Sequence, residues 1–266
     1  MRQTKLALAA VLALSGMSAF AADEPKSDWT ITGNAGLYSD YRFRGISQTN
    51  KKPAFQGGFD IGHASGFYAG NWNSNVDSVF FGGANIEMDF YGGYKGSLGD
   101  LGYDIGGLYY YYPGSDALVG SPKIKNTEIY FGLSYGPISG KLYYPVSDFF
   151  SAEKLTTFFG GTAENAAGSY YLDVSGGYDL GGGFGLTGHV GYQKLKGSAR
   201  LIEIGGTTPV ESYVDWKVGV TYTFSNAFVL GLSYIDTNRD FTGGTAALSN
   251  RKISSSAAVL SLSKTF

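Results

Sequence analysis

The sequence contains no cysteine among its 266 residues, so disulfide bonds cannot stabilise the chain, and its stability must come from packing and backbone pairing. Basic residues are not in excess, because 20 Lys and Arg stand against 22 Asp and Glu. We therefore expect no nucleic-acid partner. After the first 21 residues, no apolar run reaches the ~20 residues that a transmembrane helix needs. This excludes a helical membrane protein.

The N-terminus has the pattern of a signal peptide. Arg2 and Lys5 form a short positive region, the stretch from Leu6 to Met17 is apolar, and Ala19 and Ala21 are small residues at a cleavage position. The apolar stretch is too short to span a bilayer. We predict cleavage after Ala21, with residues 1–21 as signal peptide and residues 22–266 as a single exported domain.

Glycine and aromatic residues are abundant, with 41 Gly, 21 Tyr and 18 Phe. Aromatic residues favour strands, and glycine in strands marks bends or close approach of backbones. Alternating segments that combine the two are typical of a barrel with aromatic girdles. The composition therefore predicts an all-β protein.

Twelve segments show the period-two alternation of a strand whose two faces lie in different environments. In Val214–Phe224, one parity is apolar and the other carries Asp215, Lys217 and small or hydroxyl residues. The candidate strands are Trp29–Arg44, Ala54–Gly62, Phe67–Ser74, Asn85–Tyr94, Gly102–Tyr111, Thr127–Tyr135, Lys141–Val146, Ser169–Asp179, Phe184–Gln193, Tyr213–Phe224, Phe228–Tyr234 and Ala257–Phe266.

The connections alternate in length. Short turns such as 136–140 and 225–227 follow the even strands, whereas longer polar stretches such as 147–168 and 235–256 follow the odd ones. Short turns on one side and long loops on the other are the layout of outer-membrane barrels, which close because lipid offers no partner to a strand edge. We therefore predict a transmembrane antiparallel β-barrel of about twelve strands in the Gram-negative outer membrane, in contact with its lipid.

The C-terminal segment supports the same prediction. Residues 258–266 alternate and end on Phe266, which resembles the assembly signal of bacterial outer-membrane proteins, although Lys264 stands where an apolar residue is usual. We expect Phe266 to be the contact with the barrel assembly machinery.

Four segments resemble the TorF-type family of proteobacterial porins: Ser39–Thr49, Pro53–Asp60, Gly66–Trp72 and Tyr103–Gly106. The resemblance extends over the exported chain. It implies an outer-membrane barrel with a channel role, and it says little about the solute.

Three short motifs have alternative readings. Gly183–Gly188 satisfies G-x-G-x-x-G but leads into a strand rather than a helix, so it is a turn and not a dinucleotide site. Gly132–Gly136 satisfies G-x-S-x-G without the following helix of a nucleophile elbow. The sequence from Asp236 lacks the glycine and glutamate of a calcium loop, since Phe241 and Ala247 occupy those positions. We predict no catalytic, cofactor or metal site.

Strand parity decides which charges enter the barrel. If Tyr41 and Phe43 of the first segment face lipid, Arg42 and Arg44 face the lumen, because a charge facing lipid at mid-membrane costs about 2–4 kcal/mol. The same parity places eight acids and four bases inside. The lumen and selectivity candidates are Asp40, Arg42, Arg44, Asp60, Glu87, Asp89, Asp104, Glu128, Lys141, Asp173, Asp215 and Lys217.

The sequence thus predicts a non-enzymatic porin-like channel for passive diffusion of small hydrophilic solutes or ions, with a modest cation preference from the excess of acid. Three alternatives stay open. The barrel could be a lipid hydrolase, which would need His63 or His189, the only histidines. It could be a structural barrel plugged by internal ion pairs. A soluble β-sandwich is the third.

Overall fold

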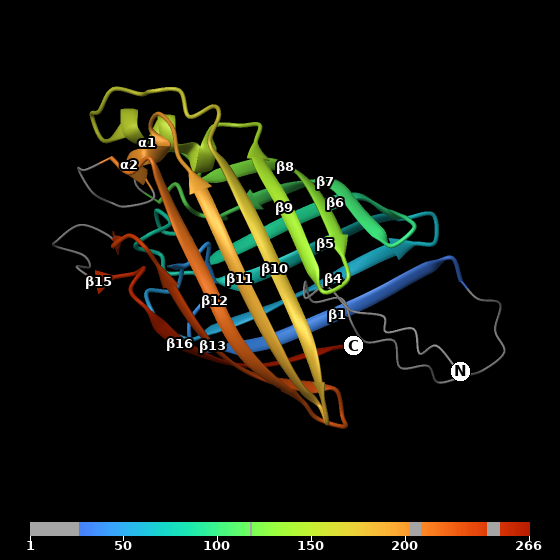
Figure 1. The fold of residues 1–266 in the computed structure, drawn as a ribbon. Coiled ribbons are helices and arrows are strands. Elements are labelled where there is room, and N and C mark those ends of the chain that lie inside the picture. The colour runs from blue at the N-terminus through green and yellow to red at the C-terminus, as the bar shows by residue number, and fades with distance from the viewer. Residues whose placement is uncertain (1–26, 118, 203–208, 244–250) are drawn as a thin grey trace, which may run out of the picture.

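The structure, a computed structural model, describes residues 27–117, 119–202, 209–243 and 251–266. The expected signal peptide, residues 1–21, lies outside these ranges. Twelve antiparallel strands form a closed barrel in the order β1-β16-β13-β12-β11-β10-β9-β8-β7-β6-β5-β4, and β4 pairs with β1 (Figure 1). The predicted fold class and strand number are confirmed.

Each barrel strand corresponds to one expected segment. The strands are β1 (Trp29–Tyr38), β4 (Ala54–His63), β5 (Phe67–Asn75), β6 (Ile86–Leu98), β7 (Leu101–Tyr111), β8 (Lys125–Tyr135), β9 (Ile138–Pro145), β10 (Tyr170–Gly181), β11 (Phe184–Lys194), β12 (Ser212–Thr223), β13 (Phe228–Thr237) and β16 (Ala257–Thr265). Two small hairpins, β2 (Arg42–Phe43) with β3 (Ile46–Ser47) and β14 (Thr242–Gly243) with β15 (Arg251–Lys252), lie in long connections.

Alternation divides the wall into two faces. In β12, Val218 and Val220 are about half exposed on the outer wall, whereas Asp215 is 1% exposed on the inner one. Antiparallel pairing keeps side chains of paired residues on the same face, so Val218 opposite Tyr234 and Gly188 belongs to a continuous outer surface. The outer wall is therefore apolar and the inner wall carries the charges.

The first predicted strand is wrong at its C-terminal end. β1 stops at Tyr38 rather than Arg44, and residues 39–53 fold back into the barrel as a loop that contains the β2–β3 hairpin. Tyr41 is buried and Phe43 packs edge-to-face on Tyr110, so neither ring faces outward. The period-two alternation in the sequence continues past Tyr38, but there the apolar side chains pack inside the barrel instead of facing lipid.

Inner tyrosines lie over glycines of neighbouring strands, which explains much of the glycine content. A Cβ on Gly106 would overlap the Tyr130 hydroxyl, and a Cβ on Gly191 would overlap the hydroxyl of Tyr171. Glycine at these positions leaves room for a flat ring against the wall. The barrel interior is thus packed by tyrosines rather than by aliphatic side chains.

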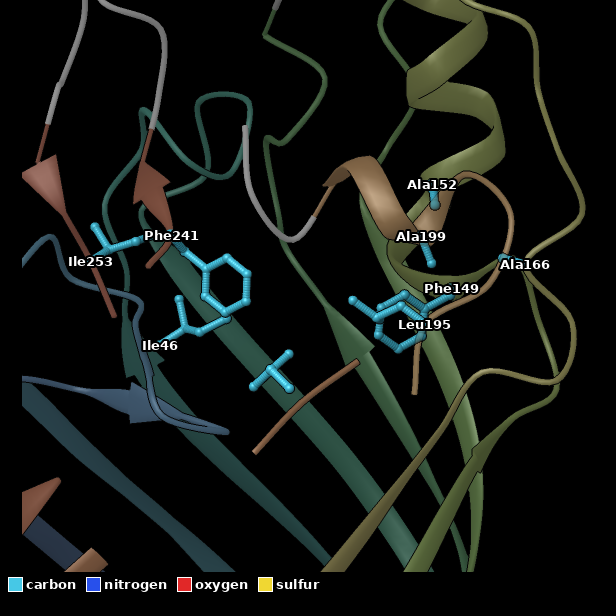
Figure 2. Close-up of a cluster of buried hydrophobic side chains, with 9 residues drawn as sticks. Ile46, Phe149, Ala152, Ala166, Leu195, Ala199, Phe241 and Ile253 are labelled. Atoms are coloured by element: carbon cyan, nitrogen blue, oxygen red, sulfur yellow. The ribbon is translucent and has the colours of Figure 1, made fainter. Parts of the chain in front are cut away.

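The long connections form a compact layer over one end of the barrel. Short segments η1 (Phe149–Ser151), α1 (Ala152–Phe158) and α2 (Ala199–Ile202) gather there with β15 (Figure 1). Beneath them Phe149 lies against Leu195, and Ile46 of the β2–β3 hairpin lies beside Phe241 and Ile253 (Figure 2). This hydrophobic cluster joins the hairpin to the loops above it. Among the described residues, no helix is long and apolar enough to cross a membrane.

Candidate functional site: the charged barrel interior

Structure and sequence agree that the charged candidates lie inside. The nine on barrel strands lie on the inner wall, as parity predicts, and they are Asp60, Glu87, Asp89, Asp104, Glu128, Lys141, Asp173, Asp215 and Lys217. Asp40, Arg42 and Arg44 are also inside, but they reach the lumen from the inward-folded loop. Parity within a strand was therefore the wrong reason for these three.

One row of the ladder carries charges of both signs around the wall. Asp104 on β7 lies in register with Lys95 on β6, Lys141 on β9 follows across Gly132, and Asp173 on β10 lies opposite Lys141. Lys141 Nζ is 2.7 Å from Asp104 Oδ2. Gly132 leaves the space in which Lys141 and Asp104 meet, because a Cβ added at position 132 would lie 3.1 Å from Lys141 Cε.

His189 joins two acids on the adjoining part of the wall. Its Nδ1 is 2.7 Å from Asp173 Oδ2 and its Nε2 is 2.8 Å from Asp215 Oδ1. Ser175 donates to Asp173 at 2.7 Å rather than to the imidazole. With a carboxylate at each ring nitrogen, both nitrogens are placed to donate, so the imidazole is not arranged to accept a serine proton.

The β2–β3 hairpin places Arg44 at the centre of the interior. Arg44 Nη2 is 2.7 Å from Glu128 Oε2, and Arg44 Nη1 donates to Gln193 Oε1 at 2.8 Å. The guanidinium carbon lies 4.4 Å from the Tyr171 ring centre and 4.7 Å from that of Phe43. Burial acts to lower the pKa of Arg44, but Glu128 and the surrounding Tyr110, Tyr171 and Tyr213 together outweigh burial and raise this pKa.

The hairpin crosses the whole lumen. On one side Tyr41 donates to Glu87 of β6 at 2.9 Å. On the other side Gly45, with φ +80°, packs so closely on β12 that a Cβ would lie 2.6 Å from Asp215 Cβ. β6 and β12 are six positions apart among twelve strands, so they are diametrically opposite. The hairpin therefore narrows the interior at this level.

Local contacts hold the hairpin in shape. Arg42 Nε donates to Asp40 Oδ2 at 2.6 Å, and Ser47 donates to the other carboxylate oxygen at 2.6 Å. Burial first, and then the Glu87 charge, raise the pKa of Tyr41 well above its ordinary value, so it stays a donor. The hairpin is thus anchored by ion pairs at its base and its tip.

The acids on β6 are less completely paired. Glu87 Oε2 and Asp89 Oδ1 are buried and accept no hydrogen bond within the described residues. Asp60 on β4 accepts from the hydroxyl of Tyr91 at 2.6 Å. Neither Asp89 nor Lys217 forms a salt bridge with another described residue. Acidic side chains without a cation partner therefore lie beside β6, and Lys217 on β12 lacks an acidic one.

Sequence reasoning missed several interior groups. His189 was considered only for the hydrolase alternative and was not expected to bridge two acids. Lys95 was left out of the charge count although it shares the inner parity of Glu87 and Asp89. Gln193 and the inner tyrosines, such as Tyr130 and Tyr171, were also missed. The strand alternation that placed the acids on the inner face could have placed these residues there too.

The other motifs remain without a site. Gly183–Gly188 forms a turn and the start of β11, as predicted. Ser134 of the G-x-S-x-G motif makes no hydrogen bond to His63 or His189 in the described parts of the chain. No cluster of three or more His, Cys, Asp or Glu suited to a metal ion occurs in those parts.

Comparison with known proteins shows the family. A family model described as "Bacterial protein of unknown function (Gcw_chp)" matches residues 22–266, so the chain belongs to this family. The resemblance to TorF-type porins remains a resemblance. No curated protein matches the sequence.

Two solved porins align with most of this chain. The NanC porin aligns with a TM-score of 0.55 at 10% identity, over 89% of this chain and 99% of the porin. The KdgM porin in complex with disordered oligogalacturonate aligns with a TM-score of 0.49 at 9% identity, over 89% of this chain and 97% of that chain. At such identity the likeness to NanC concerns the fold alone.

Proposed function

We propose that the protein is an outer-membrane channel through which small hydrophilic solutes or ions diffuse passively. The observation that carries the proposal is the closed barrel with an apolar outer wall and charges of both signs on its inner wall. Lipid tolerates only the first surface, and a water-filled pathway suits only the second. The resemblance to TorF-type porins and the porin fold of the NanC likeness support the same function.

A modest cation preference forms part of the proposal. The eight acids of the predicted set outnumber its four bases, and Lys95 raises the bases to five. Several of these charges neutralise one another in pairs, such as Lys141 with Asp104. The acids that remain in excess set the sign, because acidic side chains around a lumen favour cations.

A plugged barrel is the second candidate, and the β2–β3 hairpin favours it. The hairpin spans the lumen from Glu87 to Asp215 and is capped by the loop cluster around Phe149. Channel and plug differ in one property. A channel leaves a hydrated path beside the hairpin or opens when the hairpin moves, whereas a plug blocks ions in every state.

Planar-bilayer recording separates the two candidates. We expect refolded protein of residues 22–266 to give discrete conductance steps. Under a salt gradient, we expect the sign of the reversal potential to indicate a preference for cations. A companion variant replaces residues 40–51 with a short Gly/Ser linker, because loops tolerate such changes better than strands. If the wild-type protein did not conduct ions and the linker variant did, the hairpin would be a plug. If neither protein conducted ions, the channel would be rejected.

Location is tested on the same protein. We expect the mature chain to fractionate with outer membranes and to migrate differently on gels before and after boiling. Recovery in the soluble periplasm would contradict the membrane location, whatever the bilayer result.

A further inference from the structure

Arg44 belongs to the hairpin, but the partners of its side chain are on the barrel wall. Its Nη2 is 2.7 Å from Glu128 Oε2 on β8, and its Nη1 donates to Gln193 Oε1 on β11 at 2.8 Å. Both wall residues are 0% exposed. Each terminal nitrogen of the guanidinium therefore has its own buried acceptor, and the two acceptors come from different strands.

Two tyrosine rings lie between these acceptors. The guanidinium carbon of Arg44 is 4.4 Å from the Tyr171 ring centre and 5.6 Å from that of Tyr143. Tyr143, Tyr171 and Gln193 stand in one row across β9, β10 and β11, and Glu128 is on the neighbouring strand β8. Guanidinium groups stack on aromatic faces. Glu128, Tyr143, Tyr171 and Gln193 thus form one recess of the inner wall, which we call the wall pocket.

The acid of the wall pocket is held in place without help from the hairpin. Glu128 Oε1 accepts a hydrogen bond from Asn126 Nδ2 at 3.1 Å, and Glu128 Oε2 accepts one from the Tyr110 hydroxyl at 3.3 Å. A fixed carboxylate beside a fixed amide oxygen matches the rigid fork of N–H groups on a guanidinium. An ammonium group has neither the fork nor the flat face that stacks on a ring.

Arg42 carries the same group two residues earlier and is bound differently. Its Nε donates to Asp40 Oδ2 at 2.6 Å, and its Nη1 donates to the carbonyls of Gly45 at 3.0 Å and Ser255 at 3.1 Å. All three partners are in connections and none is on a barrel strand. Arg42 therefore braces the loops, whereas Arg44 occupies a recess that the wall itself builds.

The backbone at the hairpin tip is strained. Arg44 adopts φ +47° and Gly45 adopts φ +80°, and only the second conformation is free of cost for its residue. Strain of this kind persists only where surrounding contacts hold it, and the guanidinium makes the contacts of this residue with the wall. A group that took the place of the guanidinium would release the tip.

We propose that the wall pocket is a binding site for solutes that carry a guanidinium group, and that Arg44 occupies it as an internal ligand. The four residues of the wall pocket are on the inner wall, and the group that covers them is on a loop. A solute can therefore replace Arg44 without any opening of the barrel wall. The proposal names a solute class for the channel proposed above and rests on that function only in that the solute must reach the lumen.

Chemical rescue of Arg44→Ala in the mature chain tests the proposal. This variant empties the wall pocket and leaves its four residues in place. A ligand that binds only the folded state stabilises it, so we expect methylguanidinium to raise the melting temperature of the variant in detergent. We expect a dissociation constant of roughly 1 mM, which suits a ligand of so few atoms. Wild-type protein, whose wall pocket is filled, should show no such rise at equal salt.

Two other small molecules and two variants serve as controls. Methylammonium has the charge without the fork, and urea is planar without the charge, so neither should rescue Arg44→Ala. Glu128→Gln in the Arg44→Ala background removes the acid and should abolish the rescue. Arg42→Ala loses the same group outside the wall pocket and should gain little from methylguanidinium. If Arg44→Ala does not refold, the variant with the linker in place of residues 40–51 has the same empty wall pocket and replaces it.

The proposal would be overturned if methylguanidinium failed to stabilise a folded variant with an empty wall pocket. Equal rescue by methylammonium or urea would also overturn it, as would rescue that persists with Glu128→Gln or is equal for Arg42→Ala. Bilayer recording of the same proteins separates this proposal from the channel. Rescue without conductance would retain the site and reject the channel, whereas conductance without rescue would reject the site and retain the channel.

Discussion

Arg44 and Glu128 form a salt bridge in the interior although 84 residues separate them in the chain, with Nη2 2.7 Å from Oε2. Glu128 is on the barrel wall and is fully buried, whereas Arg44 is at the tip of a hairpin that enters from the β1–β4 connection. This pair therefore couples the position of the hairpin to the wall. Neutralisation of the Glu128 carboxylate therefore depends on where the hairpin lies.

Arg44→Ala tests this coupling. Removing the guanidinium leaves the buried Glu128 carboxylate without its cation, and breaking such a pair costs about 3–5 kcal/mol. We expect a large loss of thermal stability in detergent, together with a larger conductance or a stronger cation preference if the hairpin then moves aside. Melting curves and reversal potentials measure the two effects.

Two further variants serve as controls. Arg44→Lys keeps the charge but loses the planar fork that reaches both Glu128 and Gln193, so we expect an intermediate loss. Arg42→Ala leaves Asp40 with its hydrogen bond from Ser47, so its effect should be smaller. Equal losses from Arg44→Ala and Arg42→Ala would contradict the central role of Arg44.

Gly106→Ala tests the packing of tyrosine over glycine. The new methyl group would overlap the hydroxyl of Tyr130 and the carbonyl of Gly92, so the ring must leave its place. We expect a destabilisation of about 1–3 kcal/mol, which is the usual cost of overpacking. Gly188→Ala is the matched control, because nothing lies within 4 Å of its added Cβ. The fraction of heat-modifiable protein after refolding is the measurement, and a similar loss in both variants would be the contrary result.

Most of the barrel could be predicted from the sequence. Alternation such as that of Val218 and Val220 against Lys217 and Gly219 is a local signal, and it located all twelve strands. The inner position of Asp104 and Lys141 followed from the same parity. These features depend on near neighbours in the chain, which is why a period-two pattern suffices.

The hairpin could not be predicted in this way. Ser39–Arg44 alternates like a strand, but Tyr41 pairs with Glu87 and Arg44 with Glu128, and both partners are distant in sequence. Arg44 also adopts φ +47°, which is uncommon for a residue other than glycine. Neither the partners nor this conformation leaves a local pattern.

Asp77→Asn gives a pH-dependent test of the loop after β5. Burial acts to raise the pKa of Asp77, but the hydrogen bonds from Lys52, at 2.8 Å, and from the Val79 amide outweigh it and lower the pKa. A lowered folded-state pKa stabilises the fold above the unfolded value of about 3.9. This stabilisation is lost as the pH falls through the folded-state pKa.

Lys52 is largely exposed, so we expect wild type to exceed Asp77→Asn by about 1 kcal/mol or less at pH 7. The difference should shrink towards acid pH. Thermal unfolding of both proteins from pH 7 to pH 3 measures it, and a gap that widens on acidification would refute the assignment.

Phe266 lies at the seam that closes the barrel, and two roles of this residue can be separated. Its backbone exchanges hydrogen bonds with Gly33 at 2.8 and 3.2 Å, while its ring is 68% exposed. Phe266→Ala keeps the backbone bonds and removes the ring. Deletion of Phe266 removes both.

If the barrel assembly machinery reads the ring, Phe266→Ala should lower insertion in cells but leave refolding in detergent unchanged, because no such machinery is present there. Deletion should impair both, since the β1–β16 seam then loses its last pair of backbone bonds. Phe159→Ala is the control, because this ring is equally exposed but belongs to the loop after α1. The amount of heat-modifiable protein in outer membranes and after refolding is compared for all three variants. If Phe266→Ala matched Phe159→Ala in cells, the ring would not be a recognition signal and the seam alone would explain any effect of the deletion.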